Sequence, residues 1–301
     1  MIHGHDQIAE EVKALWASGG LPKGAYPGWP SLAKHYTVGT AQLTVVTGTP
    51  GSGKSELLDA LMVNLAKQGD WRFVIYSPEN LPISTHHAKI IEKYARRPFN
   101  PGPTQRIDET ELDGALEWMK GKFIFAKPEK PDIVSILDVA NRFTDAAEWK
   151  LSEQKTGVVI DPWNQIEHLR PQYQSETDYV SETLSTVLNW VRTRNAHVWI
   201  VAHPQKMLRG KDGKYPVPTP YDISGSAHWF NKPDACLCVW RDRGLEHTDP
   251  KSREVDIHIQ KVRFKHIGYE GMVTLSYNRI TGEYTEMEPS MVPARWGEKH
   301  A

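Results

Sequence analysis

The stretch GTPGSGKS, residues 48–55, decides the fold. It meets the pattern G-x-x-x-x-G-K-[S/T] in full. The apolar, β-branched run LTVV precedes it, and ELLDALMVNLAK follows it with leucines at helical spacing. Between a strand and a helix N-terminus, such glycines let backbone N–H groups turn toward a phosphate, and the helix dipole adds to the field. The sequence therefore predicts a P-loop.

The P-loop also predicts which groups hold a nucleoside triphosphate. We expect Lys54 to reach the β- and γ-phosphates and Ser55 to ligate Mg²⁺. The predicted cofactors are ATP, or another NTP or dNTP, and Mg²⁺. The predicted nucleotide-binding residues of the loop are Gly48, Thr49, Pro50, Gly51, Ser52, Gly53, Lys54 and Ser55.

Length and composition fit one large α/β domain with short additions at its ends. Of the 301 residues 39% are hydrophobic, and the net charge is −1, so any contact with nucleic acid must come from a local patch. Two cysteines, Cys236 and Cys238, are too few for a zinc site or a disulfide framework, and buried free thiols are expected. No signal peptide or membrane-spanning apolar run is present, so we expect an intracellular protein without membrane association.

The first 36 residues are expected to form an amphipathic helix and a linker. Residues 6–17 place Ile8, Val12, Leu15 and Trp16 on one helical stripe, and a Gly/Pro-rich segment follows. Such a helix either folds back on its own domain or docks on a neighbouring subunit.

From about residue 37 the sequence alternates strands with helices. This alternation predicts a RecA-like P-loop NTPase core of the α/β class, a parallel sheet flanked by helices, over residues 37–286. CLCVWR, EVDIHIQKVRF and GMVTLSYN are expected to add antiparallel strands at the C-terminal side, and residues 287–301 are expected to form a flexible tail. Expected strands are 42–47, 72–77, 122–126, 157–161 and 197–202; expected helices are 55–68, 83–95, 108–120, 132–149 and 176–195.

Three strand ends supply further groups of an ATPase site. GVVIDPW ends a buried strand in Asp161, which is expected beside the P-loop strand and directed at Mg²⁺. RFVIYSPEN ends in Glu79, which is either the base for the attacking water or a helix-capping carboxylate. HVWIVAHPQK ends in His203, either a γ-phosphate sensor or an ordinary loop histidine.

These motifs occur in the order SPEN, DPWNQI, AHPQK, YDISGSAHWFNKPD and QKVRF. The set resembles the hexameric replicative helicases of the DnaB superfamily, and most of all their Twinkle-like and phage primase-helicase branch. The resemblance runs from about residue 36 to residue 284. TAQL replaces the Gly-Glu-Leu that often precedes the P-loop strand, and no primase domain or zinc ribbon is present in the sequence.

The resemblance implies a motor that forms a homo-oligomeric ring, a hexamer or a heptamer, on single-stranded DNA and moves 5′ to 3′. It implies that Glu79 is the catalytic glutamate, Asp161 the Walker B acid and His203 the γ-phosphate sensor. Lys261 and Arg263 match the pair that a neighbouring subunit inserts beside the γ-phosphate, and Arg241 and Tyr277 match positions that sandwich the base. A primase is an implied partner, and the implied location is the cytoplasm of a bacterium or phage-infected host, or an organelle matrix.

The spacing of Lys261 and Arg263 fits a catalytic finger. Residues i and i+2 of a strand share a face, so both side chains can point at one target. Positive charge there would stabilise the transferring phosphoryl group. The alternative is a surface charge pair on an edge strand.

Basic loops are expected to hold the DNA backbone, because phosphates require positive charge and no base code. The segment after His203, QKMLRGKDGKYPVPTP, is one candidate, and EHLRPQYQSE, with Tyr173 as a stacking ring, is a second. ISGSAHWFNK is a third, and the alternative for it is that its aromatic side chains belong to the core. The alternative for QKMLRGKDGKYPVPTP is a solvated charged loop. The predicted DNA-binding residues are Lys206, Arg209, Lys211, Lys214, Arg170 and Lys232.

The function that the sequence predicts is that of an ATP-driven ring helicase. One alternative is a RecA-like recombinase or mediator, which shares the core fold but forms filaments and exchanges strands. The other is a DNA-binding regulatory ATPase that does not unwind DNA.

Overall fold

A computed structural model describes residues 4–69, 71–146, 154–210, 215–242 and 249–287. Nine strands of these residues form one sheet. They are β1 (Gln42–Thr47), β2 (Trp71–Tyr76), β3 (Phe123–Phe125), β4 (Lys155–Ile160), β5 (His197–Val201), β6 (Ala235–Trp240), β7 (Glu254–Val262), β8 (Gly271–Tyr277) and β9 (Tyr284–Glu286). Their order across the sheet is β3-β2-β4-β5-β1-β6-β7-β8-β9.

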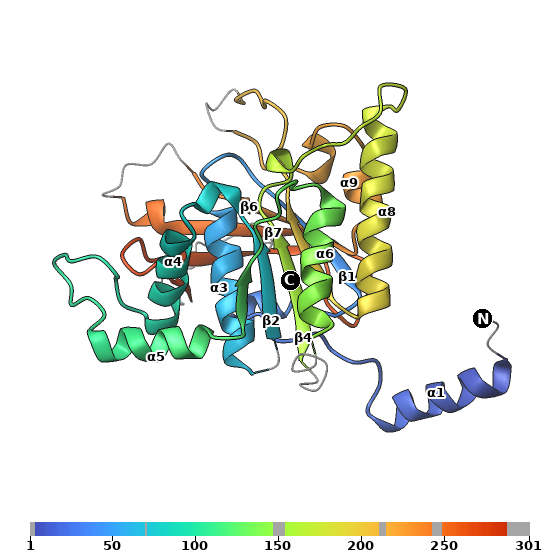
Figure 1. Cartoon of the computed structure of the whole chain (residues 1–301), viewed down its shortest axis with the longest axis horizontal. Coiled ribbons are helices and arrows are strands. Elements are labelled where there is room, and N and C mark those ends of the chain that lie inside the picture. The colour runs from blue at the N-terminus through green and yellow to red at the C-terminus, as the bar shows by residue number, and fades with distance from the viewer. Residues whose placement is uncertain (1–3, 70, 147–153, 211–214, 243–248, 288–301) are drawn as a thin grey trace, which may run out of the picture.

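Helices cover both faces of the sheet (Figure 1). The described helices are α1 (His5–Ala17), α2 (Pro30–Ala33), α3 (Lys54–Lys67), α4 (Ile83–Ala95), α5 (Glu109–Met119), α6 (Ile133–Thr144), α8 (Glu176–Arg194) and α9 (His228–Asn231). One buried apolar cluster joins α3, α4 and α5 to the sheet, and the other joins α6, α8 and α9 to the opposite face. The predicted parallel sheet with helices on both sides is confirmed.

The elements begin and end close to the expected positions, apart from the predicted helix 132–149. That helix ends at Thr144, and residues 147–149 lie outside the described residues, as does most of the predicted tail 287–301. Asp132 directly precedes α6, and its side chain accepts hydrogen bonds from the N–H groups of Val134 and Ser135, which fixes where that helix begins.

Two expectations about the sheet are wrong. The strand that ends at Asp161 does not lie beside the P-loop strand, because β5 pairs with both β4 and β1 and so separates them. The segment CLCVWR, strand β6, pairs parallel with β1 and antiparallel only with β7, so the sheet changes direction one strand later than expected. Strand order depends on how the connecting helices cross the sheet, which local sequence does not encode.

The carboxyl ends of the parallel strands share one edge of the sheet, the upper edge in Figure 1. The P-loop, the turn after β2, the segment after β4 and the loop after β5 therefore all meet at that edge, where ligands bind in open α/β sheets. Cys236 and Cys238, on β6, are buried free thiols, as expected.

Helix α1 projects from the body of the molecule (Figure 1). The side chains of Ile8, Val12, Leu15 and Trp16 are exposed, and that of Trp16 is 83% exposed. The helix therefore does not fold back on its own domain, and of the two alternatives only docking on a neighbour stays as a prediction.

Candidate active site

The P-loop owes its shape to three glycines at positive φ, Gly48 (147°), Gly51 (72°) and Gly53 (100°). A Cβ at Gly48 would lie 2.2 Å from the carbonyl oxygen of Val239, so the strand β6 leaves room only for glycine there. The side chain of Lys54 folds over the loop, where its ammonium donates to the carbonyl oxygens of Gly48 (2.9 Å) and Thr49 (3.1 Å). Burial lowers the pKa of Lys54, although the charge of nearby Asp161 opposes that shift.

Asp161 lies at the end of β4, directly beside the P-loop serine. Its side chain is buried, and burial raises its pKa to about 6 even though the hydroxyl of Ser55 donates a hydrogen bond to it. Its Oδ1 atom is buried without a hydrogen-bond partner in the described structure. An unpaired buried carboxylate oxygen next to a hydroxyl is a donor set that fits a hard divalent cation such as Mg²⁺.

Glu79 lies on a single 3-10 turn, η1 (Pro78–Asn80), between β2 and α4. Its Oε1 accepts a hydrogen bond of 2.8 Å from the side-chain amide of Gln165. Helix α4 begins after Pro82 and has no side-chain cap, so Glu79 is not the capping carboxylate of this helix. That alternative is wrong, and the role of general base stays a prediction.

His203 follows β5 and lines the same pocket as Lys54, Ser55 and Glu79. Burial and the charge of Lys54 lower the pKa of His203, while the charge of Glu79 opposes them. The imidazole is therefore neutral at neutral pH and can donate one hydrogen bond without adding charge.

The pocket, about 330 Å³, extends from the P-loop to a wall formed by Arg241, Tyr277 and Tyr284. The rings of Tyr277 and Tyr284 lie 4.9 Å apart, and the hydroxyl of Tyr284 donates to the carbonyl oxygen of Gly53 (3.2 Å). Arg241 and Tyr277 were predicted to line this pocket, but Tyr284 was not. The only signal for it is its aromatic side chain on the last short strand, and local sequence does not connect that strand to the P-loop.

A charged cluster behind the P-loop was not predicted from the sequence. Glu56 pairs with Lys89 (2.9 Å) and Lys93 (2.5 Å) of α4. Burial alone would raise the pKa of Glu56, but these two ammonium groups lower it to about 2. Deeper between the same helices, buried Asp59 and His86 form a 2.8 Å contact. These pairs fix α4, and with it the turn that carries Glu79, against the P-loop helix.

Lys261 and Arg263 do point at one target, the C-terminal end of α9 and the two residues that follow it. Lys261 donates to the carbonyl oxygens of Phe230 and Asn231, and Arg263 donates to three carbonyl oxygens of residues 231–233. Arg263 also pairs with Asp234 (3.1 Å), whose other oxygen accepts from the N–H group of Leu43 at the start of β1. The pair therefore lies at the amino edge of the parallel strands, opposite the P-loop.

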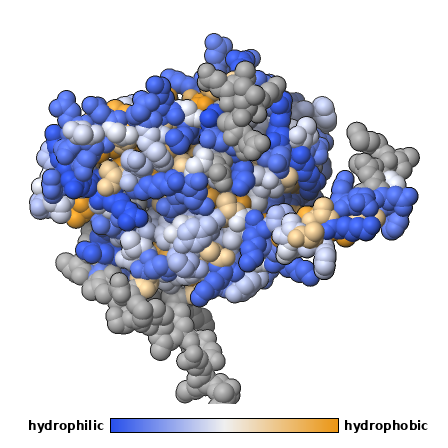
Figure 2. All heavy atoms as spheres, turned by 90° about the horizontal axis from the view of Figure 1, so that it is seen from below, coloured by the Kyte–Doolittle hydropathy of each residue, from blue (hydrophilic) through white to orange (hydrophobic). Residues whose placement is uncertain are grey.

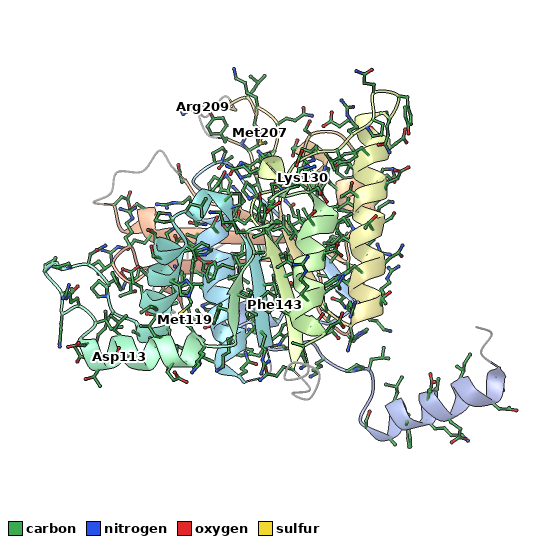
Figure 3. All side chains as sticks on the ribbon, in the orientation of Figure 1. Asp113, Met119, Lys130, Phe143, Met207 and Arg209 are labelled. Carbon is green, nitrogen blue, oxygen red and sulfur yellow. The ribbon has the colours of Figure 1, made fainter. Side chains whose placement is uncertain are left out.

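The predicted DNA-binding residues lie on different parts of the surface. Met207 and Arg209 lie on the loop beyond the carboxyl edge of the sheet (Figure 3), and Arg209 stacks on the ring of Tyr215 at 4.9 Å. Lys211 and Lys214 lie outside the described residues. Arg170 is exposed beside Tyr173, whose side chain is 92% exposed.

Lys232 differs from the other candidates because its ammonium is already engaged. It donates to the carbonyl oxygen of Ser181 (2.6 Å) and contacts the hydroxyl of Ser185, both on α8. A contact with DNA would have to replace these bonds.

Comparisons with known proteins agree with this geometry. The chain is 39% identical over 282 residues to the Twinkle homolog protein, chloroplastic/mitochondrial, of Arabidopsis thaliana. The match covers 92% of this chain and 38% of the relative, so the chain spans well under half the length of that protein. No family model matches the chain.

Solved structures share the fold at low sequence identity. A solved ATPase domain superimposes with a TM-score of 0.78 at 15% identity, over 96% of this chain and 100% of that domain. A DnaB-like replicative helicase, studied with its interactions with primase, gives 0.74 at 14% identity over 96% of this chain and 68% of that chain. The RadB recombinase gives 0.56 at 14% identity over 87% of this chain and 99% of that chain. The RecA-like fold and the resemblance to the Twinkle-like branch of the DnaB superfamily are confirmed.

Proposed function

We propose that this chain, a RecA-like domain related to a Twinkle homolog, is the motor of a ring-forming replicative helicase that hydrolyses ATP to move along single-stranded DNA. One observation carries the proposal. Lys54, Ser55, Glu79 and Asp161 meet at one edge of the sheet, whereas Lys261 and Arg263 lie at the other. A catalytic set divided between opposite edges is complete only where two copies of the chain meet.

The residues at the carboxyl edge fit the hydrolysis of a nucleoside triphosphate. Backbone N–H groups of the P-loop and Lys54 would hold the phosphates, and Ser55 and Asp161 would hold Mg²⁺, which neutralises developing charge when bound. Glu79 would take a proton from water as the water oxygen bonds to the γ-phosphorus and the bond to the β-phosphate oxygen breaks. His203 would donate to the γ-phosphate, and its neutral state suits it to register whether that group is present.

A head-to-tail ring would bring the two edges together. In a heterologous interface one subunit presents its amino edge to the carboxyl edge of the next, and rotation closes the ring. Arg263 of each copy would then stabilise the transition state in its neighbour's pocket. Arg241, Tyr277 and Tyr284 would form the wall for the base.

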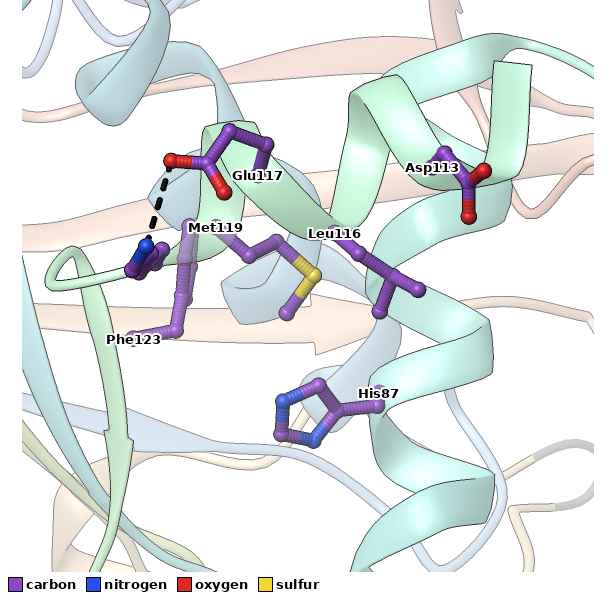
Figure 4. Close-up of a pocket in the computed structure, with 7 residues that line it drawn as sticks. His87, Asp113, Leu116, Glu117, Met119 and Phe123 are labelled. Atoms are coloured by element: carbon purple, nitrogen blue, oxygen red, sulfur yellow. Dashed lines mark hydrogen bonds and ion pairs between the residues drawn. The ribbon is translucent and has the colours of Figure 1, made fainter. Parts of the chain in front are cut away.

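The projecting helix α1 would link the subunits of such a ring. Apolar side chains run along it in the space-filling view (Figure 2), and the helix is too short to be stable alone in water. A pocket of about 540 Å³ lies between α4, α5 and β3 and would receive this helix on the neighbouring subunit. Leu116, Met119 and Phe123 line that pocket beside the charged Glu117 and Asp113 (Figure 4).

The DNA strand would follow the loop of residues 205–214, with Arg170 and Tyr173 as further contacts. Lys206 and Arg209 belong to the loop that follows His203, so a change at the γ-phosphate can be transmitted directly to the DNA-binding loop. Backbone contacts of this kind require no base sequence. A primase would be a further partner, and the protein would act inside a cell or organelle in association with DNA. In the part of the chain that the structure describes, no helix is long and apolar enough to cross a membrane.

Unwinding of a forked duplex tests the proposal. We expect ATP-dependent strand separation by the wild type and none by a Lys54→Ala variant, because that variant lacks the ammonium that would hold the phosphates. Strand exchange without unwinding would favour a recombinase, whose fold the chain also shares. Nucleotide-dependent assembly on DNA without unwinding would favour a regulatory ATPase.

A further inference from the structure

The turn that carries Glu79 is tied to both elements that carry the metal-binding residues. Glu79 is exposed and lies on a turn of three residues, η1, so its own backbone does little to fix its long side chain. A general base must nevertheless lie within hydrogen-bond reach of one water molecule. Fixing it therefore requires contacts from other elements.

The first tie comes from the segment that follows Asp161. The amide of Gln165 donates to Oε1 of Glu79 (2.8 Å), and Gln165 lies on the turn η2 (Trp163–Gln165). That turn is itself anchored, because Tyr76 donates to the carbonyl oxygen of Gln165 (3.1 Å) and the ring of Trp163 packs edge-on against Trp229 at 5.0 Å. The Gln165 amide is therefore carried by a turn that is itself held in place, four residues from the metal-binding carboxylate of Asp161.

The second tie comes from the P-loop helix. Glu56, the residue after Ser55, pairs with Lys89 of α4 (2.9 Å). Lys89 also donates to the side-chain oxygen of Asn80 (3.0 Å), and the amide of Asn80 donates to the hydroxyl of Ser77 (2.8 Å). Asn80 is the neighbour of Glu79, so this chain of bonds holds the turn through contacts that do not involve Gln165.

We propose that Gln165 and Lys89 are positioning residues that hold Glu79 at the nucleotide pocket, an inference that rests on the ATPase function proposed above. One tie begins directly after Ser55 and the other four residues after Asp161, so the base keeps its place relative to both residues. An amide suits the direct contact, because it donates a hydrogen bond but cannot compete with the carboxylate for the proton of water. One carboxylate oxygen stays bonded to Gln165, and the other is left for the water.

The test is a double-mutant cycle on hydrolysis at saturating ATP. Gln165→Ala removes a hydrogen bond to a charged group, so we expect kcat to fall about tenfold or more while the Kd for ATP stays within about twofold. Gln165→Glu keeps the shape of the side chain but replaces the donor with a carboxylate, so its kcat should fall at least as far as that of Gln165→Ala. Lys89→Met should lower kcat in the same way. In a Glu79→Gln background none of these changes should lower kcat further, because each acts only through Glu79.

Gln68→Ala is the matched control, since the side-chain amide of this exposed glutamine at the far end of α3 also donates hydrogen bonds, to the carbonyl oxygens of Tyr26 (2.7 Å) and Asn64 (3.0 Å). Its kcat should equal that of the wild type. An active wild type with Gln165→Ala no slower than this control overturns the inference and leaves the proposed function standing. A further loss in the Glu79→Gln background, or a higher Kd with unchanged kcat for Lys89→Met, also overturns it. An inactive wild type instead contradicts the proposed function itself.

Discussion

Arg263 should serve the nucleotide pocket of a neighbouring subunit and never its own. Arg263 pairs with Asp234, which also binds Leu43 near the start of β1, whereas Lys54 folds over Gly48 just after the end of that strand. The five residue-to-residue steps from Leu43 to Gly48, at about 3.3 Å each, separate the two positions by roughly 16 Å. An arginine side chain is much shorter than that, so Arg263 cannot reach the P-loop of its own chain.

Two inactive variants should therefore restore each other. Arg263→Ala and Lys54→Ala should each lose ATPase activity when alone, up to about 10³-fold for the missing finger. In rings mixed at equal amounts, about one quarter of the interfaces pair an intact P-loop with an intact finger from the other variant. We expect the mixture to recover about that fraction of wild-type ATPase activity if the sites fire independently.

Two controls make the mixing experiment decisive. Energy transfer between labelled subunits reports whether the variants enter the same rings. Dilution of wild type with Arg263→Ala reports whether sites are independent, since activity then falls linearly. Mixed rings with linear dilution but no recovered activity would refute the assignment of Arg263 to the neighbouring site.

Four further outcomes are expected. Glu79→Gln should leave ATP binding intact and lower turnover by about 10²-fold or more, and a wild-type rate would remove the general-base role. His197, whose pKa burial lowers to about 4, is neutral in the folded protein, so the unfolded chain binds more protons below its ordinary pKa of about 6.5. The contribution of His197 to the free energy of unfolding should therefore be complete above a pH of about 6.5 and fall by on the order of 3 kcal/mol as the pH drops to about 4. In urea unfolding, the free energy of unfolding of His197→Gln should depend less on pH than that of the wild type. Lys206→Ala and Arg209→Ala should each reduce the slope of log binding constant for single-stranded DNA against log salt concentration by about 0.7. An unchanged slope would show that the DNA phosphates are contacted by other residues. Deleting residues 1–20 should weaken ring assembly at micromolar protein in light scattering, and equal assembly would show that α1 does not link subunits.

Much of the active site could be predicted because its residues belong to short sequence motifs. The P-loop requires glycines at fixed spacing to reach positive φ, and the apolar run before Asp161 marks a buried strand that ends in an acid. Lys261, on β7, and Arg263, directly after its last residue, share a target because the two-residue period of extended chain puts them on one face. In each case the physical requirement lies within a few bonds of the residues concerned.

The tertiary structure decided what depends on residues far apart in the chain. Whether β5 separates the strands that end in Thr47 and Asp161 depends on how the connecting helices cross the sheet. Tyr284 joins the pocket from the last strand, 231 residues beyond Gly53, and no local pattern links the two. Gly157 looks out of place in a strand, yet a Cβ there would lie 2.6 Å from the ring of Phe73 and 2.9 Å from that of Trp199. Local backbone demands can be read from neighbouring residues, whereas packing partners exist only once the sheet has set which strands are neighbours.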